Sequence, residues 1–406
     1  MKTEEVLELI LWLSNQALEG NDNSSIFRGF CDRCVQAGLA ISHAVAVIDT
    51  LHPEFEGSAF EWSSAASTAD KTEQKYQSTN SGRAREIWET SVFNHLLVTG
   101  DIEVRRELAK GAPLDFHRLA ELKSAGHTDY LATIHRFSES GSIGEMTAVY
   151  SALATKAKTG FCDDDLQTLR KLLPMLALAL KNGTSMNIVR TLAEVYLGHD
   201  AAERVINGQI TQGAAEAIDA VIWFSDLKNY TAISDQAEPE QIIPFLNDYS
   251  GLAIDCIHRH GGSVLKLIGD GILAIFKGPD MQKACASALD AEYELRSGLK
   301  ILDARRSTAG APITGIYVGM HIGRVFFGNI GSSDRLDFTV VGPAVNEVSR
   351  ICGTCRPSGN DLLLSGDFAE ACSPDRQRQF QPVGEFSLRG VAEAKILLTL
   401  STLNLA

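Results

Sequence analysis

The chain lacks any hydrophobic segment long enough to cross a membrane. Its longest uninterrupted apolar run covers residues 172–180, whereas a membrane-spanning helix needs about 20 apolar residues. The N-terminus also lacks the pattern of a secretory signal peptide, because Glu4, Glu5 and Glu8 interrupt its apolar stretch. We therefore expect a protein that has no membrane partner and is located in the cytoplasm.

Positive charge is scarce in this sequence. The 406 residues include 37 lysines and arginines against 51 aspartates and glutamates, which gives a formal net charge of -14. Nucleic acids and anionic membrane surfaces repel such a chain at long range, because both are polyanions. The composition therefore argues against nucleic acid as a partner.

Cysteine is sparse and scattered. The eight cysteines do not form the dense framework of a disulfide-stapled domain, so we expect reduced thiols. Two C-x-x-C pairs, Cys31 with Cys34 and Cys352 with Cys355, could form a metal or redox site. Each pair lies in a helix-like stretch without a nearby histidine or a second pair, which argues against a structural metal site.

Apolar residues are plentiful and their spacing indicates a mixed first half. The hydrophobic fraction of 45% is enough for two or three domains with separate cores. Helical spacing covers residues 4–18 and 26–39, and a strand-like run follows at 43–51. The polar stretch 64–83 predicts an exposed loop before a further helix at 84–97.

The rest of this half predicts a hairpin and a long helix. Strand-like runs cover residues 128–137 and 144–154, and the short segment between them fits a turn. Asp163 is a suitable N-cap for a helix that extends to Leu180. One face of that helix is apolar, formed by Leu166, Leu169, Leu173 and Leu176.

The order of these elements over about residues 21–182 resembles a GAF-like sensor fold. We therefore expect an α/β regulatory domain at residues 1–187. Its six histidines and three cysteines leave haem, another metal or a small organic effector open, because none has an identifying spacing. The effector is thus unknown at this point, as is the sign of any regulation.

A helical linker is expected at residues 188–213. Its apolar stripe is interrupted near Gly198 and is formed by Ile188, Leu192, Val195, Val205 and Ile206. Two interpretations are open. The segment is either a packed linker or a two-stranded signalling helix whose partner is the same segment of a second subunit.

Two aspartates in the second half follow strand-like runs. The apolar run 220–224 leads to Asp226, and the hairpin over residues 262–276 has Asp270 between two glycines at its tip. Carboxylates at the ends of neighbouring strands can hold two divalent ions about 4 Å apart, an arrangement suited to displacement at phosphorus. Either aspartate alone is more typical of a turn.

A third segment makes the pattern of motifs more specific than the two aspartates alone. Residues 318–331 form a glycine-containing strand pattern that leads to Asp337 and then to a helix. On that helix Asn346 and Arg350 are four residues apart and share one face.

Together the three segments resemble the catalytic domain of class III nucleotidyl cyclases over about residues 217–400. The resemblance implies an α+β catalytic domain at residues 214–406 with a ferredoxin-like, palm-type βαββαβ core. It also implies that Asp226 and Asp270 bind two Mg²⁺ or Mn²⁺ ions in each active site.

The same resemblance assigns residues to the nucleotide base. Lys266, four residues before Asp270, matches the lysine that donates to adenine N1, and Thr339, seven before Asn346, matches the acceptor of the exocyclic amine. Threonine there is typical of the class IIIb subgroup, some of whose members respond to bicarbonate. Guanylate cyclases typically carry glutamate and cysteine or a similar pair, so ATP is favoured, although a hydroxyl discriminates less than a carboxylate.

The remaining roles concern the ribose and the phosphates. Asn346 matches the residue that orients the ribose. Arg350 matches the one that stabilises charge on the α-phosphate, for which a fixed guanidinium is well suited. Arg324 lies where some relatives bind the terminal phosphates, and is a secondary candidate.

In this family each active site takes its metal residues from one subunit and its base, ribose and transition-state residues from the other. We therefore expect a homodimer with two complete sites. The predicted activity is that of an adenylate cyclase, converting ATP to 3′,5′-cyclic AMP and pyrophosphate under control of the N-terminal domain. The alternatives are a guanylate cyclase and a catalytically silent nucleotide-binding or dimerisation module.

Overall fold

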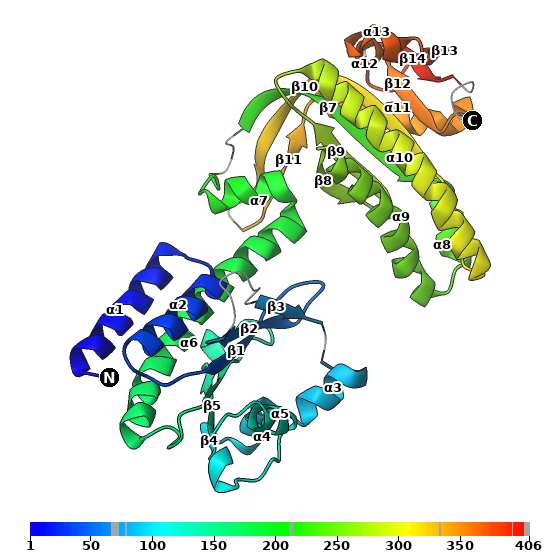
Figure 1. The fold of residues 1–406 in the computed structure, drawn as a ribbon. Coiled ribbons are helices and arrows are strands. Elements are labelled where there is room, and N and C mark those ends of the chain that lie inside the picture. The colour runs from blue at the N-terminus through cyan, green and yellow to red at the C-terminus, as the bar shows by residue number, and fades with distance from the viewer. Residues whose placement is uncertain are drawn as a thin grey trace. The chain divides into compact units, whose positions relative to one another are not determined.

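The computed structural model divides the chain into two compact units, Met1–Leu192 and Ala193–Ala406 (Figure 1). The boundary falls inside the linker expected at residues 188–213. Residues 402–406, the end of the expected catalytic domain, lie outside the described part. The structure describes residues 1–65, 73–77, 79–211, 213, 215–332, 334–391 and 393–401.

The first unit contains a six-stranded antiparallel sheet with the order β3-β2-β1-β6-β5-β4. The expected hairpin is present as the pairing of β5 with β6. The strands are β1 (His43–Asp49), β2 (Gly57–Ser63), β3 (Glu73–Tyr76), β4 (Glu103–Arg106), β5 (Asp129–Arg136) and β6 (Ala148–Thr155).

Helices cover both faces of this sheet (Figure 1). The core on one face contains the apolar residues of α1 (Thr3–Glu19), α2 (Asn23–Gln36) and α6 (Asp163–Leu197). A second core on the opposite face is formed with α4 (Val92–Thr99) and α5 (His117–Ser124). Strand β1 contributes to both because successive side chains alternate between faces.

Three local expectations for this unit were wrong. The single helix expected at 84–97 is two helices, α3 (Gly82–Glu89) and α4, because the Ser91 hydroxyl caps α4 by accepting from the Asn94 amide at 3.1 Å. The loop expected at 64–83 contains β3, although its residues 66–72 and 78 lie outside the described part. The helix from Asp163 continues beyond Leu180 to Leu197.

The second unit is built on an eight-stranded sheet with the order β13-β14-β12-β10-β7-β9-β8, and β11 pairs with β10. All pairings are antiparallel except that of β10 with β12. The strands are β7 (Ala215–Leu227), β8 (Ser263–Ile268), β9 (Gly271–Phe276), β10 (Ile316–Gly331), β11 (Leu336–Val341), β12 (Leu362–Ser365), β13 (Phe380–Phe386) and β14 (Lys395–Leu400).

Two layers flank this sheet. Helices α9 (Pro239–Arg259) and α10 (Met281–Thr308) cover one face, where their apolar residues pack around Trp223. The other face is covered by α11 (Pro343–Ser358) together with β11. The order β7, α9, β8, β9, α10, β10 is the expected βαββαβ pattern, so the α+β fold class is confirmed. The described part of this unit also contains the short helices α8 (Tyr230–Gln236), α12 (Gly366–Ala371) and α13 (Pro374–Gln377).

The linker region is helical with a break at Gly198, as expected. Helix α6 ends at Leu197 and α7 (His199–Ile206) begins after Gly198, whose φ is 80°. A Cβ at this glycine would lie 2.6 Å from the Val264 carbonyl oxygen, so only glycine fits. Ala201 and Ala202 of α7 are buried. Val195, at the end of α6, is 54% exposed.

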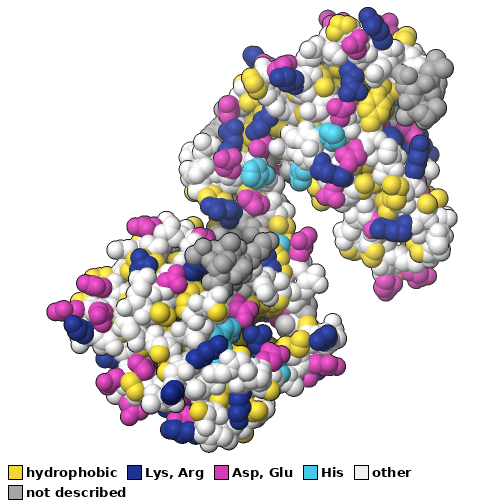
Figure 2. Space-filling model, in the orientation of Figure 1, with side chains coloured by type: hydrophobic (Ala, Val, Ile, Leu, Met, Phe, Trp, Pro, Cys, Tyr) yellow, Lys and Arg dark blue, Asp and Glu magenta, His cyan; other side chains and the backbone are white. Residues whose placement is uncertain are grey.

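The surface carries both signs of charge. Figure 2 shows acidic and basic side chains interspersed over the visible face, so the net charge of -14 does not come from one acidic patch on that face. None of the described helices combines the length and the apolar character that crossing a membrane requires.

Candidate active site

Asp226 and Asp270 are brought together by strand pairing. Asp226 lies near the end of β7, where Ser225 pairs with Ile272 of β9. Asp270 lies in the β8–β9 turn, which Gly269 permits with a φ of 63°. The Leu227 amide donates to Asp270 Oδ2 at 3.2 Å, which holds the turn beside the end of β7.

The two carboxyls interact strongly. Burial, repulsion from Asp270 and a hydrogen bond between the two side chains raise the pKa of Asp226 to about 6. Neither aspartate forms an ion pair with any residue that the structure describes. Gly271 allows this close approach, because a Cβ there would lie 2.9 Å from the Ser225 carbonyl oxygen.

This donor set fits a divalent cation that prefers oxygen ligands. Two adjacent carboxylates supply hard oxygen donors, and their mutual repulsion is relieved when a cation binds between them. Mg²⁺ in particular is commonly held by one or two carboxylates together with substrate phosphates and water. Asp226 and Asp270 are thus the residues that would hold the ions.

Lys266 lies on the same hairpin but faces β11. The ladder between β8 and β9 shifts register between Val264 and Lys266, which aligns Lys266 with Leu273. That shift turns the side chain toward the face where β11 contacts β8. The Lys266 ammonium forms an ion pair with Asp337 of β11.

Asp337 is a residue that sequence reasoning missed. It stands two residues before Thr339 on β11, so the two side chains point to the same face of the strand. Thr339 pairs with Gly328 and is only 8% exposed. The structure thus brings Lys266, Asp337 and Thr339 to one neighbourhood. The signal that could have found Asp337 is its i, i+2 spacing from Thr339.

Asn346 and Arg350 lie on the exposed side of α11, one turn apart, as predicted. Pro343 begins the helix directly after Gly342, whose φ is 145°. Within the described part of the chain, the Arg350 guanidinium has no carboxylate partner. It is therefore free to meet an anionic ligand.

A buried polar network, also missed from the sequence, anchors α11. The Phe368 amide donates to Ser365 Oγ at 3.1 Å, and Ser365 Oγ lies 2.8 Å from His321 Nδ1. His321 Nε2 lies 3.3 Å from Glu347 of α11, whose carboxylate also pairs with Lys395 at 3.4 Å. Burial lowers the pKa of His321, which favours a neutral ring that donates from Nε2.

Arg324 is separate from the two aspartates in the same chain. It pairs across the β7–β10 ladder with Asp219, with a distance of 3.2 Å between Nε and Oδ1, and its side chain is 69% exposed. Asp219 precedes Asp226 by seven residues on one strand, which is about 23 Å along an extended backbone. The Arg324 guanidinium is therefore already engaged in an ion pair with Asp219.

Both C-x-x-C pairs lie on helices, Cys31 and Cys34 on α2 and Cys352 and Cys355 on α11. All four thiols are unbonded and buried. Cys31, Cys34 and Cys355 belong to the hydrophobic cores of their units, and Cys352 is 2% exposed. Their packing gives each of them a structural role.

Comparison with known proteins gives the class of the second unit. Residues 214–400 match the family model described as the adenylate and guanylate cyclase catalytic domain. The second unit therefore carries an adenylate and guanylate cyclase catalytic domain. The recognition made from the three motifs is confirmed to that extent.

Individual relatives agree with this class. The chain is 34% identical to an adenylate cyclase of Anabaena cylindrica over 156 residues, which are 38% of this chain and 31% of that protein. It is 26% identical to adenylate cyclase 1 of Rhizobium meliloti (strain 1021) over 193 residues, which are 46% of this chain and 28% of that protein. The chain thus spans less than a third of the length of either relative.

Solved structures of cyclases also match. The guanylyl cyclase Cya2 is 26% identical, with a TM-score of 0.41 and coverage of 46% of this chain and 93% of that one. The adenylyl cyclase CyaB from P. aeruginosa is 22% identical, with a TM-score of 0.41 and coverage of 46% and 96%.

Proposed function

We propose that the chain is an adenylate cyclase that converts ATP to 3′,5′-cyclic AMP and pyrophosphate between two copies of itself. The observation that carries this proposal is the pair Asp226 and Asp270, two adjacent carboxylates that have no cation among the described residues. Such a pair is suited to metal-assisted chemistry on a nucleoside triphosphate.

The reaction forms one bond and breaks one bond at the α-phosphorus. The ribose O3′ attacks the α-phosphorus and loses its proton to solvent water, while the bond from that phosphorus to the bridging oxygen of the β-phosphate breaks and pyrophosphate leaves. Mg²⁺ or Mn²⁺ ions bound at Asp226 and Asp270 would lower the pKa of the 3′ hydroxyl and neutralise phosphate charge. The carboxylate oxygens of the two aspartates are already positioned for metal binding, because β7 and the β8–β9 turn fix the two residues.

Two residues of α11 serve the ribose and the α-phosphate. Arg350 stabilises the charge that develops on the α-phosphate oxygens, and Asn346 orients the ribose so that O3′ lies in line with the leaving oxygen. Their helix is held against the sheet by Glu347, which fixes the backbone from which the two side chains extend. Arg324 is a candidate for the terminal phosphates, for which it would have to exchange its partner Asp219.

The base is bound by Lys266 and Thr339. Lys266 donates to adenine N1 and Thr339 accepts from the exocyclic amine. Asp337 keeps the Lys266 ammonium on the β11 side of the hairpin. The alternative substrate is GTP, because a hydroxyl at position 339 can also donate to the O6 of guanine.

Two chains are needed because the metal-binding residues and the base-binding residues of one chain belong to two different active sites. Asp226 and Asp270 of one protomer meet Lys266, Thr339, Asn346 and Arg350 of its partner, so a homodimer has two sites. The N-terminal unit regulates this assembly by binding an effector.

The direct test supplies the full-length protein with equal ATP and GTP, together with Mg²⁺ or Mn²⁺, and measures both cyclic products. We expect cyclic AMP to dominate. Asp226→Asn and Asp270→Asn should each lower kcat by at least about a hundredfold, because each removes a negative metal ligand.

Asp375→Asn is the matched control, because Asp375 is an exposed aspartate at the start of α13. It should retain the activity of the unmodified protein. Unchanged kcat in either active-site variant would contradict the metal assignment, and a predominance of cyclic GMP would support the guanylate cyclase alternative.

A further inference from the structure

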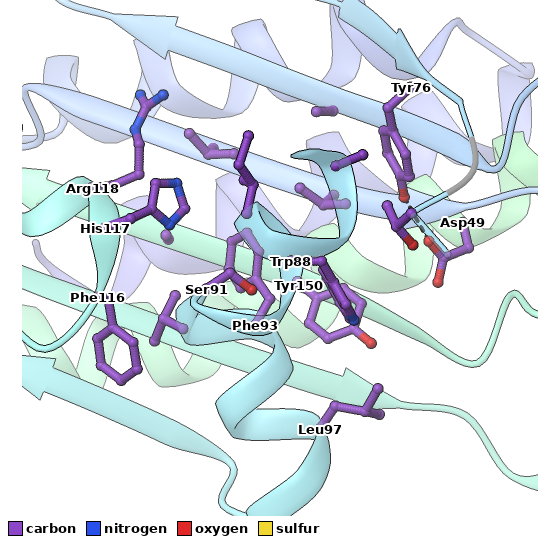
Figure 3. A pocket seen from close by; sticks show the side chains of 18 of the residues that line it. Asp49, Tyr76, Trp88, Ser91, Phe93, Leu97, Phe116, His117, Arg118 and Tyr150 are labelled. Atoms are coloured by element: carbon purple, nitrogen blue, oxygen red, sulfur yellow. Dashed lines mark hydrogen bonds between the residues drawn. The ribbon is translucent and has the colours of Figure 1, made fainter. Parts of the chain in front are cut away.

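The first unit contains a cavity of about 920 Å³ between the sheet and the helices α3, α4 and α5 (Figure 3). Strands β1 and β6 form its floor and contribute half-buried residues such as Val45 and Val47. A cavity of this size is typical of sites that enclose small organic molecules.

Aromatic side chains line the middle of the cavity. Trp88 stands edge-on to Tyr150, with ring centroids 5.8 Å apart and an interplanar angle of 84°, and Phe93 lies 5.4 Å from the same ring. Figure 3 shows these three rings together in the cavity, contributed by α3, β6 and α4. Flat π surfaces of this kind attract both apolar rings and cations.

One end of the cavity is acidic. Asp49, Glu56 and Glu145 line it, and none of the three is ion-paired with a residue that the structure describes. Asp49 accepts a 2.6 Å hydrogen bond from the Tyr76 hydroxyl, and Glu56 accepts from the Thr79 hydroxyl at 2.8 Å. The carboxylates are thus oriented by neutral donors, and their charge is left uncompensated.

The position of Tyr76 at the acidic end of the cavity depends on a glycine. Tyr76 packs over Gly57, where a Cβ would lie 2.2 Å from the Tyr76 hydroxyl oxygen, so glycine is required for Tyr76 to reach Asp49. Figure 3 shows Tyr76 and Asp49 joined at this end.

Tyr150 provides an independent indication of a ligand. Its side chain is 1% exposed and lines the cavity. Its hydroxyl forms no hydrogen bond with a described residue, although it interacts electrostatically with Asp49. This hydroxyl is therefore available to form a hydrogen bond with a ligand atom in the cavity.

The charge balance of the lining excludes an anion as the preferred occupant. Among the described lining residues there are four carboxylates and one cationic guanidinium, that of Arg118. Arg118 is already paired with Glu61 at 3.1 Å and with Glu121 at 3.7 Å. Figure 3 shows Arg118 at the end opposite Asp49. A phosphate or carboxylate would therefore meet net negative charge.

We propose that this cavity binds a small aromatic amine, with its ammonium group against Asp49, Glu56 and the Tyr150 hydroxyl and its ring among Trp88, Phe93 and Tyr150. The ammonium supplies the missing positive charge and donates hydrogen bonds to the carboxylates. The ring gains contact with the aromatic wall. This assignment stands independently of the cyclase reaction, because it concerns binding to the first unit.

The test compares three ligands of similar shape and different charge by isothermal titration calorimetry on the full-length protein. Tryptamine is the cation, tryptophol the neutral analogue and indole-3-acetate the anion. We expect tryptamine to bind at least about tenfold more tightly than tryptophol. Indole-3-acetate should bind more weakly than either.

Two variants locate the site. Asp49→Asn keeps the acceptor for Tyr76 but removes the charge, and should weaken tryptamine at least about tenfold while leaving tryptophol nearly unchanged. Tyr150→Phe should weaken tryptamine several-fold through the lost hydrogen bond. Glu139→Gln, an acid-to-amide change at an exposed position outside the cavity, is the control and should have no effect.

Thermal unfolding of each variant establishes that it is folded before binding is compared. The assignment is overturned if folded Asp49→Asn binds tryptamine with unchanged affinity, or if tryptophol binds as tightly as tryptamine. It is also overturned if tryptamine and phenethylamine both fail to give saturable binding at millimolar concentration.

Discussion

At the scale of single residues, both units hold carboxylates in surroundings that disfavour their charge. Burial is the main reason that the pKa of Asp49 rises to about 6, and nearby Glu56 and Glu145 raise it further, while the Tyr76 hydrogen bond acts in the opposite direction. Because the folded pKa lies above the unfolded value of about 3.9, the fold is stabilised by protonation. Stability is therefore lost as the pH rises from about 4 through 6.

Asp49→Asn should remove the free-energy cost of burying the ionised Asp49 carboxylate. We expect the free energy of unfolding to increase by roughly 1–2 kcal/mol at pH 7.5 and by clearly less at pH 4, where Asp49 is protonated in the folded state and about half protonated in the unfolded state. Urea unfolding at the two pH values, without added ligand, measures the difference. A gain of the same size at pH 4, or a similar gain in Glu139→Gln, would contradict this explanation.

The sequence points to the candidate site residues more readily than to the residues that contact them. Asp226, Asp270, Lys266 and Asn346 stand at fixed spacings in motifs, and spacing is visible in a sequence. Asp337 and Glu347 act through contacts with Lys266 and His321 that depend on how distant strands fold together. No local pattern encodes such contacts, so they became visible only with the fold.

At the scale of secondary-structure elements, the position of α11 depends on the chain of polar groups from Ser365 through His321 to Glu347. Glu347 stands next to Asn346 and one turn from Arg350 on this helix. Its carboxylate joins α11 to β10 through His321 and to β14 through Lys395. The helix is thereby fixed relative to the sheet.

Glu347→Ala should lower kcat about tenfold with a smaller change in KM for ATP, because Arg350 would lose its fixed position in the transition state. It should also lower the unfolding temperature, since a buried His321 N–H is left without an acceptor. Glu347→Gln keeps an acceptor for His321, so its kcat and unfolding temperature should be close to those of the unmodified protein. Steady-state kinetics of both variants are the measurement, and a larger loss in Glu347→Gln than in Glu347→Ala would rule out this role.

Elements differed in how well the sequence predicted them. Every residue of β9 is buried, and its continuous apolar run was found as a strand. Strands β2 and β4 were not found, because most of their residues are partly exposed and many are polar. The break between α3 and α4 depends on one serine cap, which hydrophobic spacing alone does not register.

At the scale of the whole molecule, the proposed homodimer makes a prediction that a monomeric site does not. Asp270→Asn damages the metal half of a site and Arg350→Ala damages the other half, so each variant alone should be inactive. In a freely exchanged equal mixture, half of the dimers are mixed and each has one intact site. Activity should therefore recover to about a quarter of that of the unmodified protein.

The matched control mixes Asp226→Asn with Asp270→Asn. Both substitutions damage the same half, so no mixed dimer has an intact site and activity should stay absent. Cyclic nucleotide formation is measured before and after mixing. Failure of the first mixture to recover, with exchange verified by tagged subunits, would exclude a site shared between protomers.

Gly198 lies at the junction of α6 with α7, against the strand that carries Lys266. This glycine ends the helix that begins in the first unit, and its α-carbon lies against the Val264 carbonyl, where no side chain could be accommodated. Val264 stands at the register shift that orients Lys266. A change in the direction of α6 at Gly198 would therefore act two positions from Lys266, the residue proposed to bind the base.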